Sequence, residues 1–345
     1  RYCLMNKIAD LEKELNQKLE EIKKSHKNKI KVFTISSTAK LEKLSYFTPL
    51  RCNDNIVIIG IVTFSIKDIV KFKNIINKKF NYIFLDNDAS KLKHESVNIY
   101  NLCKKMFSKE KIVSYKPNDI TVEACWNQVF NFSSQIKNKV LIVGIGNIGT
   151  KLAIKLYESG LNIYATRNNH LMGKNTIKFI KKFIKKSDNF IKYEKSFDNV
   201  LNDVNVIISC ASKNHIIGIN SVKKIKSSSV IIELGKNNLT PDAVNLARRK
   251  NITTFRLDIS MFMLSHIDNI INFKRNQNIL YGRKKFKKYY LVSGGYIGYE
   301  GDIVVDNFKK PRYIFGIANG SGDFKSRINQ MDYKIGNIIL GHKIK

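Results

Sequence analysis

Apolar and polar residues along the 345-residue chain follow two periods, which together predict an α/β protein. Over residues 6–25, apolar side chains recur three or four positions apart, as in an amphipathic helix. From about 30 to 120, β-rich runs such as "IKVFTISS" and "NIVIIGIVTF" alternate with segments of helical spacing such as "IKDIVKFKNIINKK". A helix over 121–135, capped by Thr121, is expected to lead out of this region. The pattern therefore predicts a helix within 1–29 and an α/β domain over 30–135, which includes the linking helix.

The N-terminal helix carries one apolar stripe, which consists of Ile8, Leu11, Leu15, Leu19 and Ile22. The stripe is too short for a long coiled coil. We expect it to dock either on the body of the protein or on a second subunit, and the second case would give a homo-oligomer.

From residue 139 the alternation becomes regular. Strands are predicted at 139–143, 161–165, 205–209, 229–233 and 252–257, and helical segments are predicted to begin near Ile148, Asn175, Phe197, Ser221 and Pro241. The strands are apolar on both faces, which is typical of a parallel sheet covered by helices. A doubly wound parallel sheet is therefore expected in a domain over 136–260, preceded by the smaller α/β domain.

The pattern changes again near residue 260. Ten of the eighteen glycines lie within 282–341, where they separate short β-like runs. Residues 261–345 are therefore expected to form a Gly-rich lobe or a lid that contains β structure.

Three glycines directly follow the first strand of the regular region. Gly144, Gly146 and Gly149 stand between "KVLIV" and a helical segment. In this setting the first glycine permits a tight turn, the second lets the backbone approach a pyrophosphate, and the third lets helix and strand pack closely. The pyrophosphate would lie at the helix N-terminus, next to Asn147 and Ile148. The motif predicts a dinucleotide site of the Rossmann type, and a purely structural turn is the alternative.

The end of the second strand bears on the choice of cofactor. An acidic residue there accepts hydrogen bonds from the ribose 2′-hydroxyl of NAD. This chain has Thr166 and Arg167 instead, and a guanidinium suits a 2′-phosphate. NADP is therefore favoured, and a solvated arginine with NAD as cofactor is the alternative.

The fourth strand ends in small residues, Cys210 and Ala211, which would leave room for a nicotinamide ring. Apart from His215, no residue that could activate the Cys210 thiol is visible nearby in the sequence. We therefore interpret this cysteine as a small packing residue and not as a nucleophile.

These segments resemble a known group of enzymes. "KVLIVGIGNIG", "IYATRN", "VNVIISCAS" and "SSVIIELG" resemble the cofactor domain of the shikimate dehydrogenase, glutamyl-tRNA reductase and methylenetetrahydrofolate dehydrogenase group. The resemblance covers roughly 138–258 and implies pyridine-nucleotide redox chemistry, with Thr166 and Arg167 at the NADP phosphate. The substrate motifs of these families are missing, so the resemblance names no substrate.

Hydride transfer also needs a proton donor near the cleft at the carboxyl ends of the strands. Lys116 and Asp119 follow a first-domain strand. Lys116 is a candidate for the acid, and Asp119 for its orienting or substrate-binding partner. Arg256 and Asp258 end the last strand of the cofactor domain, as an anion clamp or as an ion pair. Glu233 and Lys236 are weaker candidates.

Composition limits the other functions. The net charge is +33, but only ten of the 61 basic residues are arginine and the lysines are spread along the chain, so nucleic-acid binding is disfavoured. Five cysteines without C-x-x-C spacing predict no disulfide framework and no metal site, and they favour the cytoplasm. The longest apolar run is too short to span a membrane, and no signal-peptide pattern opens the chain.

The sequence therefore predicts an NADP-dependent oxidoreductase that acts on a small polar metabolite at a C=O or C=N carbon. A non-catalytic dinucleotide-binding regulator or scaffold is the first alternative. A basic nucleic-acid binder that uses "GRKKFKKYY" at 282–290 is the second.

Overall fold

The computed structural model describes residues 2–37, 45–88, 91–92, 97–133, 139–184, 188–235, 237–294, 296–326, 336–337 and 339. The chain divides into two compact units, Arg1–His266 and Ile267–Lys345, which are described separately. Among the described residues, no helix is both long and apolar enough to cross a membrane.

The first sheet is a mostly parallel sheet with antiparallel additions at one edge. It consists of β1 (Ile30–Ser37), β2 (Tyr46–Phe47), β3 (Arg51–Cys52), β4 (Ile56–Thr63), β5 (Tyr82–Asp86) and β8 (Ile112–Tyr115). The strand order is β2-β4-β1-β5-β8, with β3 also paired to β4. The strands β4, β1, β5 and β8 are parallel, so their carboxyl ends share one edge of the sheet. A separate ladder pairs β6 (Lys91–Leu92) with β7 (Val97–Asn98).

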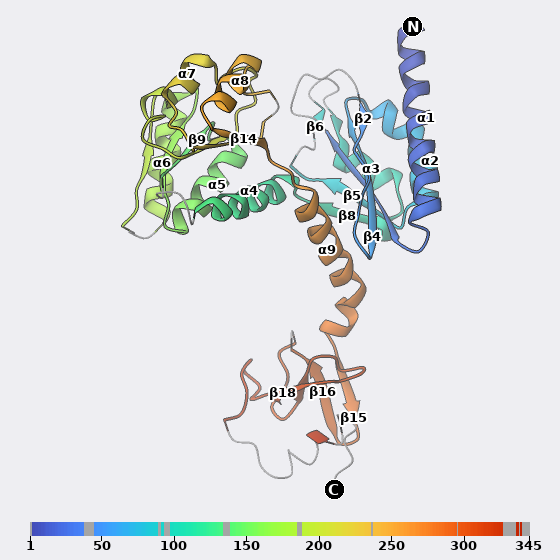
Figure 1. Cartoon of the computed structure of the whole chain (residues 1–345). Helices are drawn as coiled ribbons and strands as arrows, with labels where there is room; N and C mark the ends of the chain where they lie inside the picture. The colour runs from blue at the N-terminus through green and yellow to red at the C-terminus, as the bar shows by residue number, and fades with distance from the viewer. Residues whose placement is uncertain are drawn as a thin grey trace. The chain divides into compact units, whose positions relative to one another are not determined.

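One face of this sheet packs against three helices, α1 (Tyr2–Ser25), α2 (Ile66–Lys79) and α3 (Ile99–Met106), as Figure 1 shows. Leu15 and Ile22 of α1 are buried at 0% and 2% exposure in the same core as Phe33 and Phe72. The described part of the predicted stripe thus docks on the body of the protein, because an amphipathic helix gains most from burying its apolar face. The homo-oligomer remains a prediction, and the side chain of Ile8 lies outside the described residues.

The second sheet has six parallel strands. They are β9 (Lys139–Val143), β10 (Asn162–Thr166), β11 (Ile191–Tyr193), β12 (Val206–Ser209), β13 (Val230–Glu233) and β14 (Thr253–Arg256). Their order is β11-β10-β9-β12-β13-β14, so the chain starts in the middle of the sheet and winds outward in both directions. This is the strand order of the Rossmann fold, and the predicted doubly wound fold class is confirmed.

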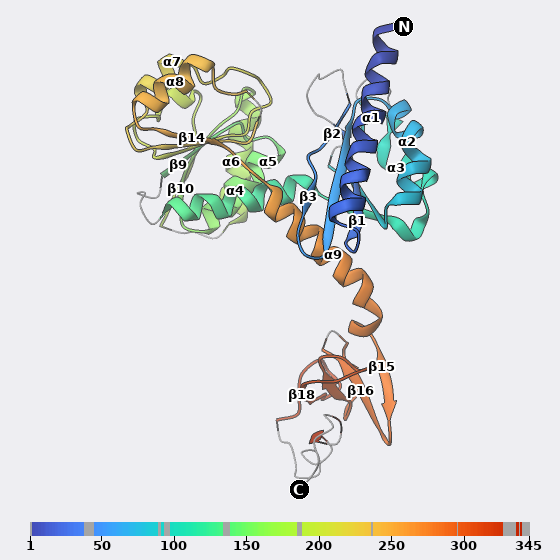
Figure 2. The same cartoon turned by 45° about the vertical axis from the view of Figure 1, so that its right-hand side comes forward.

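Helices cover both faces of the second sheet. The helices α4 (Pro117–Ser133), α5 (Asn147–Glu158) and α6 (His170–Phe183) share one core with the sheet. The helices α7 (Ile219–Lys224) and α8 (Pro241–Arg249) share the core of the opposite face, and Figure 2 shows the two groups on either side of the strands.

Several predicted boundaries are wrong. The helix expected at 121–135 begins at Pro117, and Thr121 lies inside it, where its hydroxyl donates to Pro117 O at 3.0 Å. The helix expected from Asn175 begins at His170, because Asn169 caps it by accepting from Met172 N. The segment at Phe197 forms only a 3₁₀ turn, η2 (Phe197–Asn199).

Several elements escaped prediction, among them the two-residue strands β2, β3, β6 and β7, the strand β11 and the helix α9. The strand β11 has only three residues, too few to show a period. The helix α9 (Ser260–Leu280) follows β14, in a region that shows no clear amphipathic pattern. A further 3₁₀ turn, η1 (Lys109–Lys111), precedes β8.

The second unit contains a sheet of four strands, β15 (Arg283–Phe286), β16 (Tyr289–Ser293), β17 (Ile303–Val305) and β18 (Ile314–Ile317). The strands β15 and β16 form an antiparallel hairpin, β17 is parallel to β16, and β18 is antiparallel to β17. The expected Gly-rich segment therefore contains β structure, and its role as a lid remains a prediction.

Candidate cofactor-binding site

The turn between β9 and α5 has the geometry that its three glycines predict. Gly144 has a φ of 99°, and its amide donates to Thr166 O at 3.0 Å, which fixes the turn to the end of β10. A Cβ on Gly149 would lie 2.3 Å from the carbonyl oxygen of Gly144, so helix and strand approach too closely for any side chain there. A Cβ on Gly146 would meet nothing within 4 Å. The first and third glycines are thus needed by the fold, and the second faces open space.

The N-terminus of α5 has no capping side chain. Gly146 occupies the N-cap position and makes no side-chain hydrogen bond. Asn169 caps α6 and Thr240 caps α8, whereas α7, like α5, follows a glycine without a side-chain cap. The first N–H groups of a helix lack acceptors within it, and an anion is a suitable acceptor for them.

A cavity of about 810 Å³ opens at this turn. Its walls include all nine residues that the sequence predicts for cofactor binding, namely Gly144, Gly146, Asn147, Ile148, Gly149, Thr166, Arg167, Cys210 and Ala211. Residues that the prediction missed complete the lining, among them Asn118, Asn168, His170, Lys195, Ser196, Phe197, Ser212, Lys213, His215 and Ile216. The cavity therefore lies at the carboxyl ends of the central strands, where Rossmann domains bind dinucleotides.

The charge of this cavity has one sign. Arg167, Lys195 and Lys213 line it together with His170 and His215, and no carboxylate is among its described lining residues. Such a lining attracts polyanions and would repel none of the phosphates of a dinucleotide.

Arg167 is tied to the glycine turn. Its Nη1 donates to Ile145 O at 3.0 Å, and its own carbonyl accepts from Tyr193 Oη at 3.2 Å. The same hydroxyl lies 2.7 Å from Nδ1 of His170. The close packing of Tyr193 depends on Gly173, where a Cβ would lie 2.3 Å from the tyrosine ring. The arginine is thus held beside the cavity by the glycine turn and by Tyr193 of β11, which α6 contacts in turn.

Asn238 joins the two loops on the other side of the cavity. It is fully buried, and its Nδ2 donates to Ala211 O at 3.1 Å and to Lys213 O at 2.8 Å. Its Oδ1 accepts from Ser209 Oγ at 2.7 Å. One amide therefore fixes the loop that follows β12 to the loop that follows β13.

Replacing this amide should destabilise the domain. In Asn238→Ala, the carbonyls of Ala211 and Lys213 and the buried hydroxyl of Ser209 lose their partner, so we expect the free energy of unfolding to fall by about 2 kcal/mol. Equilibrium unfolding in urea measures the change. Asn168→Ala, whose side chain is exposed, is the control and should change stability by less than about 0.5 kcal/mol. Equal stability of the two variants would contradict the assigned role of Asn238.

Cys210 lines the cavity, and burial raises the pKa of its thiol to about 12. Because the thiolate is the reactive form, this cysteine is a poor nucleophile near neutral pH. The interpretation of Cys210 as a packing residue is consistent with this environment.

Alkylation separates the packing role from a nucleophilic one. Because burial raises the pKa of Cys210 far above pH 8, iodoacetamide at that pH should label the exposed Cys52 well before it labels Cys210. A time course of peptide mass spectra measures both rates. Labelling of Cys210 as fast as that of Cys52 would show an activated thiolate.

The predicted catalytic pair Lys116 and Asp119 does not pair in the structure. Lys116 is exposed at the end of β8, and the carboxylate of Asp119 lies 2.5 Å from Nζ of Lys151 on α5. Asp119 also acts on His266 of α9, where burial lowers the histidine pKa and the aspartate opposes that shift. Asn118, between the two predicted residues, lines the cofactor cavity. The start of α4 thus lies beside the predicted cleft, with Lys151 and His266 as additional polar groups.

Arg256 and Asp258 are also not an ion pair among the described residues. The carboxylate of Asp258 accepts from Ser260 N at 2.8 Å. Hydrogen bonds from the side chain and then the backbone of Ser260, together with the charge of Arg51, lower the pKa of Asp258. Arg51 Nε in turn donates to Ser260 Oγ at 2.9 Å. Asp258 is therefore occupied at the start of α9.

Arg256 lines a second cavity, of about 500 Å³, together with Glu233, Asn237 and His215. Glu233 also accepts from Asn238 N at 2.5 Å, so its carboxylate helps to hold Asn238 between the two loops. Lys236 lies outside the described residues. The roles of Arg256 and Asp258 in catalysis remain predictions.

The missed lining residues follow elements whose sequence signals are weak. Lys195 and Ser196 follow β11, the three-residue strand, and His170 opens a helix that was placed five residues too late. The cap formed by Asn169 was the available signal for His170.

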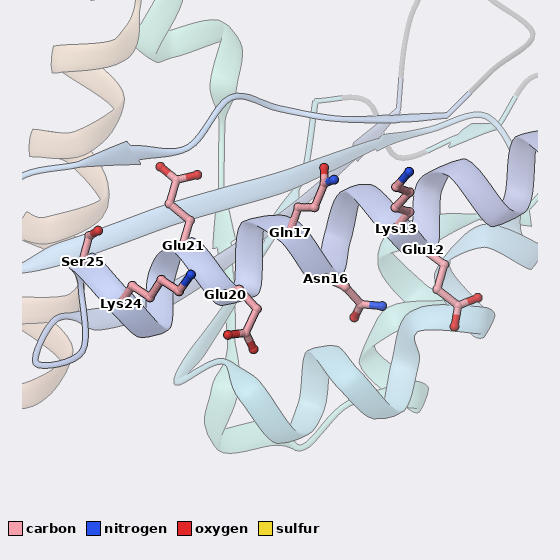
Figure 3. A pocket seen from close by; sticks show the side chains of 8 residues that line it. All are labelled: Glu12, Lys13, Asn16, Gln17, Glu20, Glu21, Lys24 and Ser25. Carbon is pink, nitrogen blue, oxygen red and sulfur yellow. The ribbon is translucent and has the colours of Figure 1, made fainter.

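A larger hollow, of about 940 Å³, runs along α1, but its lining side chains do not converge on a common point as those of a binding site do. Figure 3 shows its lining side chains, which are Glu12, Lys13, Asn16, Gln17, Glu20, Glu21, Lys24 and Ser25. All of them belong to one helix and point to different sides of it, so they converge on no common point.

No protein-family model matches the chain, and no curated protein matches it. Similar solved structures include shikimate dehydrogenase from Aquifex aeolicus (15% identity, TM-score 0.42, 70% of this chain and 92% of that one). Quinate dehydrogenase from Corynebacterium glutamicum has 10% identity and a TM-score of 0.42, over 68% of this chain and 89% of that one. L-tryptophan dehydrogenase from Nostoc punctiforme has 12% identity and a TM-score of 0.42, over 72% and 75%. Shikimate dehydrogenase belongs to the group that the sequence resembles, but at these TM-scores the similarity carries no argument about activity, which has to come from the site.

Proposed function

We propose that the chain is an NADP-dependent oxidoreductase that acts on a small polar metabolite at a C=O or C=N carbon. The observation that carries the proposal is the cavity at the glycine turn, which combines an uncapped helix N-terminus with several cations and no described carboxylate. Because NADP carries one phosphate more than NAD, this charge pattern favours NADP.

The residues of the cavity have separable tasks in this proposal. The N-terminal amides of α5 bind the pyrophosphate, which Gly146 allows to come close. Arg167 binds the 2′-phosphate at the end of β10, where NAD-binding domains have a carboxylate. Lys195, which also lines the cavity, adds to the positive potential. Cys210 and Ala211 leave room for the ring that supplies or accepts the hydride.

The proton needed for carbonyl reduction would come from the residues around the start of α4. Lys116 and Asp119 remain the candidates from the sequence, and Lys151 and His266 share their surroundings. A lysine can donate a proton near neutral pH when its surroundings lower its pKa. Burial lowers the pKa of His266 as well, and this favours the neutral imidazole, which would accept the proton in the oxidative direction.

Turnover of a substrate panel tests the proposed activity. The full chain should oxidise NADPH, followed at 340 nm, with at least one member of a panel of small polar aldehydes, ketones and imines. Gly146→Val supplies the background rate, because it removes cofactor binding and keeps the fold. Saturable NADPH binding without turnover on the whole panel would instead favour a non-catalytic regulator.

A further inference from the structure

The C-terminal unit carries an unusual density of exposed aromatic side chains. Of the fourteen large hydrophobic side chains that are exposed among the described residues, six lie within 281–324, a small fraction of the chain. They are Tyr281, Ile297, Tyr299, Tyr313, Phe315 and Phe324, with exposures from 46% to 69%. Exposed apolar side chains clustered in this way are typical of an interaction surface.

Two of these side chains, Tyr299 and Phe324, lie over one face of the sheet. Strand register places Lys285 opposite Tyr290 and Arg283 opposite Val292, and cross-strand partners point to the same face. Val292 and Val304 form a small core there with Ala318. Gly316 is the strand partner of Val304. The ring of Phe324 covers it so closely that a Cβ on Gly316 would lie 2.6 Å from the ring.

Arginine and tyrosine are stacked on this face. The guanidinium carbon of Arg283 lies 3.5 Å from the ring centroid of Tyr290 and 4.8 Å from that of Tyr299. Two hydrogen bonds of 2.8 Å to the buried Asp302 hold the guanidinium in place and raise the pKa of Arg283. Tyr299 is nevertheless 65% exposed, so this fixed stack presents an aromatic ring to solvent.

The charge of the same unit is strongly positive. Residues 281–326 contain nine basic and four acidic residues. Each of the four acids has a local partner: Asp302 pairs with Arg283, Glu300 pairs with Lys325, and Asp306 and Asp323 accept from backbone amides. The basic residues thus outnumber the acids of this segment by more than two to one, and its acids are already occupied.

We propose that this face of the C-terminal unit binds single-stranded nucleic acid. Exposed rings fixed beside cations suit unpaired bases, which stack on aromatic side chains while their phosphates meet lysine and arginine. The net positive charge disfavours a second copy of the chain as the partner. The sequence alone offers only the basic run "GRKKFKKYY" at 282–290 for such binding. The strand register and the loops around Tyr299 and Phe324 add the exposed rings to it. The proposal is independent of the cofactor site.

Fluorescence anisotropy with the full chain tests it, using a labelled twenty-nucleotide oligothymidylate and an abasic oligomer of the same length and charge. We expect the oligothymidylate to bind more tightly than the abasic oligomer by at least about fivefold, since stacking contributes for each base. Affinity should fall steeply as salt rises. Equal affinity for the two oligomers would reduce the interaction to general electrostatics and overturn the proposal, as would no binding at low salt.

Variants locate the surface. Tyr299→Leu, which keeps an apolar side chain but removes the ring, should weaken oligothymidylate binding by about fivefold or more, and Tyr299→Phe should retain it. The double variant Phe179→Ala/Phe183→Ala removes an exposed stacked pair on α6 and is the matched control. The assignment would be overturned if Tyr299→Leu bound oligothymidylate as tightly as the wild type, or if the α6 control lost as much affinity for it. NADPH binding should be the same in all of these variants.

Discussion

Gly146→Val should abolish dinucleotide binding and leave the fold intact. Nothing lies within 4 Å of the position where its Cβ would stand, and the residue lines the cofactor cavity. The added side chain therefore fills the space in which the pyrophosphate approaches the backbone. We expect NADPH affinity to fall by about a hundredfold or more, equivalent to about 2.8 kcal/mol, with an unchanged melting temperature.

Gly149→Ala provides the contrasting case. Its Cβ would lie 2.3 Å from the backbone oxygen of Gly144, so the turn or the helix must move. Overpacking of this kind costs about 1–3 kcal/mol. Thermal unfolding and calorimetric titration of both variants separate the two roles. If Gly146→Val unfolded as readily as Gly149→Ala, or bound NADPH like the wild type, the assignment of the second glycine to the ligand would be wrong.

Arg167→Glu should reverse the cofactor preference. The carboxylate would repel a 2′-phosphate and would accept hydrogen bonds from a ribose 2′-hydroxyl. We expect NADPH affinity to fall by about a hundredfold and NADH affinity to stay within about threefold. The variant should therefore bind NADH more tightly than NADPH. Titrations at about 150 mM salt limit the general attraction of anions to a chain of charge +33.

A matched variant controls for net charge. Arg248→Glu makes the same change in charge at an exposed position of α8, which does not line the cofactor cavity. It should leave the ratio of NADPH to NADH affinity unchanged. A similar shift in both variants would assign the preference to the overall field of the protein and not to Arg167.

The sequence predicted best those features that depend on local chemistry. The segment around Gly144, Gly146 and Gly149 could be placed between a strand and a helix, because a φ of 99° and a 2.3 Å approach admit only glycine. The doubly wound parallel sheet followed from the regular alternation after residue 139. The nine predicted cofactor residues line one cavity for the same reason, since the carboxyl ends of parallel strands meet at one edge.

Features that depend on distant contacts could not be predicted. Asp119 was paired with Lys116 by proximity in the chain, whereas the packing of α4 on α5 brings Lys151 to it. Arg256 and Asp258 stand two residues apart in the sequence, yet Asp258 accepts a hydrogen bond from the start of α9. The sequence of α9 shows no clear amphipathic pattern, so this helix could not be predicted. The role of Asn238 depends on two loops that run side by side only in the folded domain.

Calorimetric titration of the wild-type chain with NADPH and with NADH, at about 150 mM salt, tests the central claim most directly. We predict saturable binding at one site per chain, with NADPH bound at least about tenfold more tightly than NADH, a difference of about 1.4 kcal/mol. Equal or tighter binding of NADH would contradict the role of Arg167, and the absence of saturable binding by either nucleotide would contradict the assignment of the cavity.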